Sequence, residues 1–137
     1  MPPPGGKQVR IDPAANPDWF GMHIAWHFRD LDHEGPFGWH VCDRETLVET
    51  IMKRIESFET MRWKEIPAKL LHPIKISDLA PAAQKRLEEI EQMDIAELWC
   101  LRIGKKPRVW GIRDRLYFRV LWWDPDHAVY QMNVKDN

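Results

Sequence analysis

The spacing of apolar side chains predicts two helices in the first two thirds of the chain. Between residues 44 and 62, apolar residues recur every three or four positions, which is the period of a helix with one buried face. Asp43 can cap this helix, because an N-cap carboxylate accepts hydrogen bonds from the free amide groups of the first turn. A second helix is predicted from 77 or 80 to 92. The apolar stripe of the first helix consists of Leu47, Val48, Ile51, Met52, Ile55 and Phe58.

Alternation of apolar and polar residues predicts strands on either side of these helices. Residues 23–31 alternate in this way before the first helix, and residues 72–76 form a brief extended segment between the two helices. The remaining strands are predicted at 97–103, 108–113 and 116–123, with an optional edge strand at 128–134.

Both faces of the strand at 116–123 are partly apolar. Strict alternation places Phe118, Val120 and Trp122 on one face. This pattern is expected if helices cover one face of the sheet and another part of the chain covers the other. The elements together predict an α+β fold, a compact single domain at 23–137 in which an antiparallel β-meander packs against two α-helices.

Two segments outside these elements have a distinctive composition. Residues 1–22 are rich in proline and glycine, which predicts an extended or disordered arm. The GPFGW segment at 35–39 contains turn residues, but Phe37 and Trp39 predict that it folds back onto the body of the domain.

Charge and cysteine content narrow the functional classes. The net charge of −1 gives no global attraction to nucleic acid, but residues 102–119 hold seven basic side chains and one acid. Two cysteines are too few for a disulfide framework, and Cys100 is predicted to be a buried structural thiol. The chain has no apolar run of membrane-spanning length and no signal-peptide core at its start. We therefore expect a soluble cytoplasmic protein without membrane contact.

Motifs for common catalytic centres are absent. The sequence has no GxSxG, Walker A or GxGxxG motif. His33, His40 and Cys42 are close in sequence, but their spacing matches no zinc motif, so neither a metal nor another cofactor is predicted.

The basic meander remains as the candidate site. Metal-free RNA cleavage needs a base for the 2′-hydroxyl proton, cations for the phosphorane charge and an acid for the leaving oxygen. His127 and Tyr130 are candidate proton carriers, and the arginines could hold phosphate. The candidate catalytic residues are Arg102, Arg108, His127 and Tyr130. The candidate nucleic-acid-binding residues are Lys105, Lys106, Arg113 and Arg119.

The same segment resembles a known family. It contains a strand ending in LRIG, an Arg-Val-aromatic strand, an Asp-Arg turn, an apolar strand and a closing Val-Tyr pair. This pattern, over residues 98–130, is similar to the RelE/ParE/HigB-like toxin superfamily. The order strand, two helices, meander is also that of the compact RelE-like fold. The WWDP-x-H-x-VY ending resembles that of bacterial proteins for which we know no activity.

The resemblance implies a function and partners. RelE-type members are ribosome-dependent mRNA endonucleases that act without a metal and are neutralised by a partner antitoxin. Arg102, Arg108 and Tyr130 fall on basic and tyrosine positions of the family pattern, and His127 lies near its histidine. At 124–126, Asp-Pro-Asp stands where many members have His and Arg, and an acidic turn repels RNA phosphate.

Two other functions are consistent with the sequence. The first is a non-catalytic interaction module from a phage or mobile element, which would bind a protein or nucleic acid through a tryptophan-rich face. It predicts an exposed apolar patch around Trp39, Trp122 and Trp123. The second is DNA binding by the basic hairpin.

Overall fold

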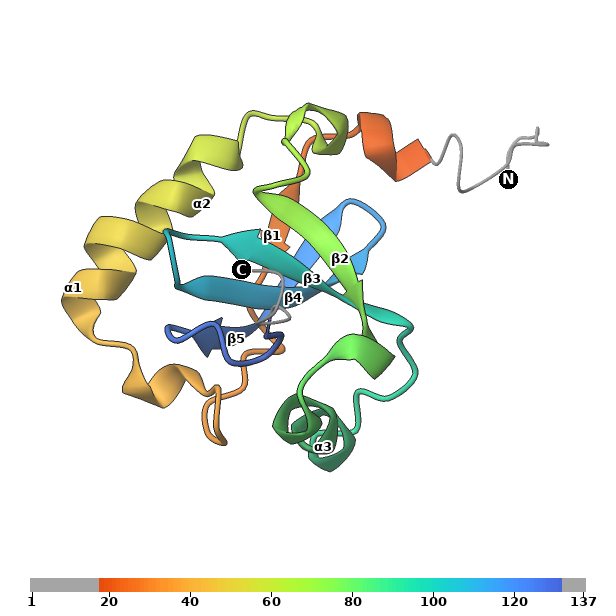
Figure 1. Cartoon of the computed structure of the whole chain (residues 1–137). Coiled ribbons are helices and arrows are strands. Elements are labelled where there is room, and N and C mark those ends of the chain that lie inside the picture. Colours follow the sequence, from red (N-terminus) through yellow and green to blue (C-terminus); the bar gives the residue numbers. More distant parts are fainter. Residues whose placement is uncertain (1–17, 132–137) are drawn as a thin grey trace.

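A five-stranded sheet in the order β1-β5-β4-β3-β2 forms the centre of the structure, a computed structural model that describes residues 18–131 (Figure 1). Neighbouring strands from β2 to β5 are antiparallel, whereas β1 is parallel to β5. The predicted α+β class is confirmed, and the segments expected at 23–31 and 72–76 form the two edges of the sheet. The strands are β1 (Ala25–His27), β2 (Leu71–Lys75), β3 (Glu97–Arg102), β4 (Arg108–Asp114) and β5 (Tyr117–Asp124).

The first helical segment is continuous but irregular. It comprises α1 (Arg44–Thr46), a π-helical turn η3 (Leu47–Ile51) and α2 (Met52–Phe58). Asp43 caps it as predicted, accepting from the amide of Thr46 at 2.6 Å. The segment ends before the predicted residue 62, because the following chain pairs its backbone with residues 22–24 instead of continuing the helix.

The second helix, α3 (Pro81–Glu89), lies on the opposite side of the sheet from α2 (Figure 1). Pro81 occupies its first turn, where the missing amide hydrogen is not needed. Because β2 separates the two helices in sequence, the chain runs strand, helix, strand, helix and then three strands. The order strand, two helices, meander, given by the family resemblance, is therefore interrupted by β2, which joins the sheet as an edge strand.

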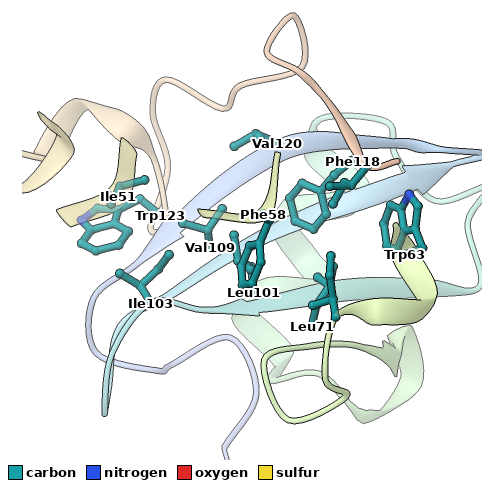
Figure 2. Packing of buried hydrophobic residues seen from close by; sticks show 12 residues of the cluster. Ile51, Phe58, Trp63, Leu71, Leu101, Ile103, Val109, Phe118, Val120 and Trp123 are labelled. Carbon is teal, nitrogen blue, oxygen red and sulfur yellow. The ribbon is translucent and has the colours of Figure 1, made fainter. Parts of the chain in front are cut away.

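Two hydrophobic cores lie against the two faces of the sheet. Figure 2 shows the first core, in which Ile51 and Phe58 of the first helical segment contact strand residues such as Leu101 and Val109. In the second core, Ala83 and Leu87 of α3 pack against the other face; the strand residues there include Leu98, Trp110 and Trp122. Both faces of the last strand are thus covered, as expected, but by one helix on each face and not by the helices on one face alone.

Strict alternation in β5 is wrong beyond Val120. Trp110 pairs with Trp122, while the next residue of β4, Gly111, pairs with Val120, so Leu121 is an extra residue in a β-bulge. As a result Leu121 and Trp122 both belong to the second core, and Trp122 faces away from the side that Phe118 and Val120 share. The sequence pattern alone does not reveal this insertion.

The GPFGW segment folds back onto the domain, as predicted. Phe37 is buried, its carbonyl accepts from the Trp123 amide at 3.0 Å, and Trp39 donates from Nε1 to the Leu121 carbonyl at 3.1 Å. The amide of Asp32 donates to the same Leu121 carbonyl at 3.0 Å. The bulge therefore presents a backbone acceptor that anchors this loop.

The two ends of the chain differ from their predictions or lie outside the described residues. Within the predicted arm, residues 18–21 form a 3-10 turn, η1 (Asp18–Gly21), and Trp19 packs against the first core; residues 1–17 lie outside the described part. The edge strand expected at 128–134 is wrong for residues 128–131, which have no strand structure, and residues 132–137 are not described. Val129 is instead fully buried in the second core.

Replacing Gly111 with alanine should lower the free energy of unfolding by about 1–3 kcal/mol, because overpacking a filled core forces neighbours to move. A Cβ atom there would lie 2.6 Å from the Arg119 carbonyl oxygen and would overlap the Phe118 ring. Urea unfolding measures the change. Gly21→Ala is the matched control, since nothing lies within 4 Å of its added Cβ. Equal stability of the two variants would contradict the tight packing at the bulge.

Candidate functional site

Positive side chains converge on the turn between β3 and β4. Four of them come from the turn or the strands beside it, and Arg54 comes from α2 on the far side of the first core. We call this group the turn cluster; it consists of Arg54, Arg102, Lys105, Lys106 and Arg108.

The arginines of the turn cluster hold the turn through its backbone carbonyls. Arg108 Nη1 donates to the carbonyls of Gly104, Lys105 and Pro107 at 3.0, 3.3 and 3.0 Å. Arg102 Nε donates to the Gly104 carbonyl at 3.1 Å, and Arg54 Nη2 donates to the Ile103 carbonyl at 3.2 Å. A turn held by three guanidinium groups is a fixed platform for the two lysines at its tip.

Lys105 and Lys106 are exposed, Arg102 is half-buried and Arg108 is buried. Across the ladder, Arg102 lies directly opposite Arg108, a pairing of like charges that is unfavourable without an external anion. Burial lowers the pKa of the Arg108 guanidinium, but an arginine stays protonated at any physiological pH.

Within residues 18–131 no carboxylate forms an ion pair with the turn cluster, although the buried Asp124 lies opposite Arg108 in the sheet and attracts its charge. The ion pairs found there are Lys53–Glu49, Arg86–Asp32, Arg86–Glu89 and Arg119–Asp30, and none includes a member of the cluster. Surface charges are usually mixed in sign, so that their fields partly cancel. Five cations around one turn without an ion-pair partner instead create a local positive field that attracts anions.

Arg113 and Arg119 do not join this cluster. The Arg113 guanidinium lies 3.8 Å from the centre of the Trp19 ring and also faces Trp99, while its Nη1 donates to the Arg115 carbonyl. Arg119 forms an ion pair with Asp30 at 2.9 Å, which holds the pKa of that carboxyl below its usual value. Both arginines therefore serve the packing of the N-terminal segment against the sheet.

His127 and Tyr130 follow the end of β5. The pairing of Arg108 with Asp124 places this end beside the turn cluster. His127 has a left-handed backbone, with φ of 56°, and Tyr130 is half-buried against the second core. No hydrogen bond joins either side chain to another described residue, so the structure does not assemble them into a catalytic pair.

The acidic turn at 124–126 differs from its sequence-based interpretation. Asp124 is fully buried, and its carboxyl oxygens accept from Trp110 Nε1 at 3.0 Å and from the amides of Ala128 and Val129 at 2.8 and 3.0 Å. Asp126 is exposed. Asp124 therefore anchors the chain inside the fold, and only Asp126 faces an approaching anion.

A second candidate site is an apolar groove of about 330 Å³ between the loop after β1 and the first helical segment. Phe28 and Leu31 form one wall, Leu47, Met52 and Ile55 form the other, and Val120 of β5 lies beneath. Leu47 and Met52 of the predicted helical stripe thus line this groove instead of the core, and they are 37% and 51% exposed. Val48, 47% exposed, lies outside both the groove and the core. We call this feature the helix–strand groove.

The exposed patch expected around Trp39, Trp122 and Trp123 is absent. Trp122 is fully buried with its Nε1 bonded to Asp32 Oδ2 at 2.8 Å, and Trp123 is buried in the first core. Trp39 is half-buried, stacks on Trp123 and lines the helix–strand groove. The exposed apolar surface is therefore displaced from the strands to the helix, for which the sequence predicted complete burial.

The cysteines and histidines form no site in the described residues. Burial raises the pKa of the Cys100 thiol to about 12, so this residue is the buried structural thiol that was predicted. Cys42 is half-buried, packs against the first core, and donates from Sγ to the Asp43 carbonyl. Within residues 18–131, no three His, Cys, Asp or Glu side chains are arranged to hold a metal ion.

Two further comparisons concern the helices and the similarity of the chain to known proteins. None of the helices in residues 18–131 has the length and apolar character needed to cross a membrane. No family model, no curated protein and no solved structure matches the chain.

Proposed function

We propose that the protein binds RNA through the turn cluster and is an RNA-directed relative of the RelE/ParE/HigB-like toxins. The observation that carries this proposal is the convergence of five cations on one turn without a carboxylate partner among residues 18–131. RNA phosphates would lie across Lys105 and Lys106, since lysine side chains at a fixed turn can follow a flexible backbone. Arg102 would add donors from its free Nη1 and Nη2 groups.

Cleavage of the bound RNA is the further part of this proposal. The turn cluster would stabilise the phosphorane charge, and the proton transfers would fall to His127 and Tyr130 at the adjacent end of β5. As in the family, this chemistry would require no metal, would act on mRNA in the ribosome, and would be held in check by an antitoxin protein in the cytoplasm. The order of helices and strands departs from the family pattern, so the cationic turn supports the proposal more strongly than the fold does.

Charge reversal at the tip of the turn should abolish RNA binding. We expect the Lys105→Glu/Lys106→Glu double variant to bind a 20-nucleotide single-stranded RNA at least about tenfold more weakly than the wild type at 50 mM salt, because two phosphate contacts become repulsions. Fluorescence anisotropy measures the affinity. The matched control is Lys75→Glu/Lys85→Glu, which changes the net charge equally at two exposed lysines outside the turn cluster.

Three outcomes discriminate the parts of the proposal. Equal loss in both double variants would show a nonspecific charge effect and overturn the assignment of the turn. Tighter binding of duplex DNA than of RNA would favour the basic hairpin as a DNA contact. If expression of the wild type does not arrest growth, and RNA stays intact when the protein is added to translating ribosomes, the toxin part fails while RNA binding stands.

A non-catalytic interaction module is the second candidate function. The helix–strand groove favours it, because several large apolar side chains lie exposed around one concave surface. The tryptophan-rich face first expected for such a module is excluded by the burial of Trp122 and Trp123.

A further inference from the structure

The helix–strand groove has the form of a peptide-binding site. Its lining is almost entirely apolar, and a contiguous hollow extends it along β1, where it is lined by Ile24, Ala25 and Trp26. Phe28, Met52 and Ile55 line both hollows, so the two form one continuous surface. Phe28 and Met52 stay 49% and 51% exposed, which leaves large side chains in water that a partner could cover.

One wall of this surface is the edge of the sheet. Among residues 18–131, β1 is an edge strand of the sheet, and its partner strand there is β5. Immediately before β1, the Ile24 amide points away from β5 and donates to the Met61 carbonyl, so the outer side of the chain is covered there. Amides of a strand alternate in direction, so the amide of Trp26 points to the same outer side, toward the hollow. An extended peptide lying there could add to the edge of β1 and place alternate side chains in the groove.

Charge specifies the chemistry of the peptide. Glu56 and Glu59 line the β1 end of the surface, and neither forms an ion pair with a described residue. None of the described residues that line the two hollows is a lysine or an arginine. A basic side chain of a partner would thus find two free carboxylates, whereas a second copy of this chain would bring its own acidic rim against them.

We propose that the helix–strand groove binds an extended segment of a partner protein, with alternating apolar residues for the groove and a basic residue for Glu56 and Glu59. This inference is independent of RNA binding. Arg54 of the turn cluster reaches toward the β3–β4 turn, and Met52 and Ile55 face the groove on another side of the same helix.

A random 12-residue peptide library displayed on phage tests the proposal. We expect the wild type to select peptides with alternating apolar residues and at least one Lys or Arg. A selected peptide, made synthetically, should bind Met52→Glu at least about tenfold more weakly, since a charge would replace a central apolar contact. Met93→Glu is the matched control, because Met93 is 50% exposed and lies outside both hollows.

Two further variants keep the test decisive. Phe28→Ser removes the opposite wall and should weaken binding even if Met52→Glu disturbs the helix, which thermal unfolding would reveal. Glu56→Lys/Glu59→Lys should weaken the basic peptide and strengthen a version with its basic residues changed to glutamate. N-methylation of alternate peptide amides should abolish binding in one register only, as required for addition to an edge strand.

Several results would overturn the inference. Selection of acidic or helical peptides, or of peptides that bind Met52→Glu and wild type equally, would reject the proposed occupant. A wild-type dimer in sedimentation that Met52→Glu dissociates would identify a second copy as the occupant instead. RNA affinity should be the same in wild type and Met52→Glu, so failure here and failure of the turn cluster are distinguishable.

Discussion

Replacing Asp32 with alanine should lower the free energy of unfolding by about 3–5 kcal/mol, the typical effect of removing one partner of a buried ion pair. The Asp32 side chain is 3% exposed and accepts from Arg86 Nε at 2.9 Å and Nη2 at 2.8 Å. Its Oδ2 also accepts from Trp122 Nε1, and its Oδ1 from the Glu34 amide. The variant would leave Nε and Nη2 of the half-buried Arg86 guanidinium, and a fully buried indole N–H, without their acceptor.

Urea unfolding of the wild type, Asp32→Ala and Glu89→Gln measures this effect. Glu89 is the matched control because it also pairs with Arg86, at 3.0 Å, but its side chain is 48% exposed. Exposed pairs contribute about 0.2–1 kcal/mol, so Glu89→Gln should stay close to the wild type. If the two variants lose similar stability, the carboxylate of Asp32 is not the anchor of its loop.

The effect of Asp32 should also depend on pH. Burial acts to raise the pKa of this carboxyl, but the hydrogen bonds from Arg86, Trp122 and the Glu34 amide outweigh it and hold the pKa below 3.8. Because the folded pKa is lowered, the stabilisation is complete above the unfolded pKa and is lost as the pH falls through the folded one. The wild type and Asp32→Ala should therefore converge in stability as the pH falls below about 3.8.

The position of Asp32 illustrates what the sequence pattern could not supply. Asp32 and Arg86 are 54 residues apart, and neither stands in a motif. Periodicity predicts which elements form, because it reports the buried face of each helix or strand by itself. It carries no information on which charged side chain of one element meets which of another. The ion pair that joins Asp32, just before the GPFGW segment, to α3 consequently had no signal in the sequence.

The first helical segment shows a related limit. Its residues from 44 to 58 and its cap at Asp43 follow from local patterns, and these were predicted. The pattern also predicted burial of the whole stripe, yet the sheet has room only for Ile51, Phe58 and part of Ile55, and Val48 and Met52 remain outside. A stripe wider than the core it faces is a signal of a partner surface that periodicity alone cannot distinguish from core.

The turn cluster was predictable where it is local in sequence. Arg102, Lys105, Lys106 and Arg108 flank one turn, so any hairpin at 104–107 brings them together. Arg54 joins them through tertiary packing and had no sequence signal. Arg113 and Arg119 were expected at the same site, but they lie along β4 and β5, away from the β3–β4 turn, where Trp19 and Asp30 engage them.

Replacing Asp124 with alanine should lower the free energy of unfolding by about 3 kcal/mol or more, because one buried carboxyl group satisfies three N–H donors. The loss would leave the Trp110 indole N–H and two amides of the closing segment without acceptors, in a region where Trp110 and Val129 are fully buried. Thermal and urea unfolding measure the change.

Asp126, two residues along the same turn, is the control. It is exposed and forms no ion pair with a described residue, so Asp126→Ala should change stability by less than about 0.5 kcal/mol.

The pair of variants also separates the two interpretations of this acidic turn. If Asp124 is structural and Asp126 alone faces solvent, Asp126→Ala should bind RNA at least as tightly as the wild type, since a repelling charge is removed beside the turn cluster. Lost stability in Asp126→Ala, or a stable Asp124→Ala with tighter RNA binding, would contradict this assignment. Asp124 would then be the exposed residue that repels RNA phosphate.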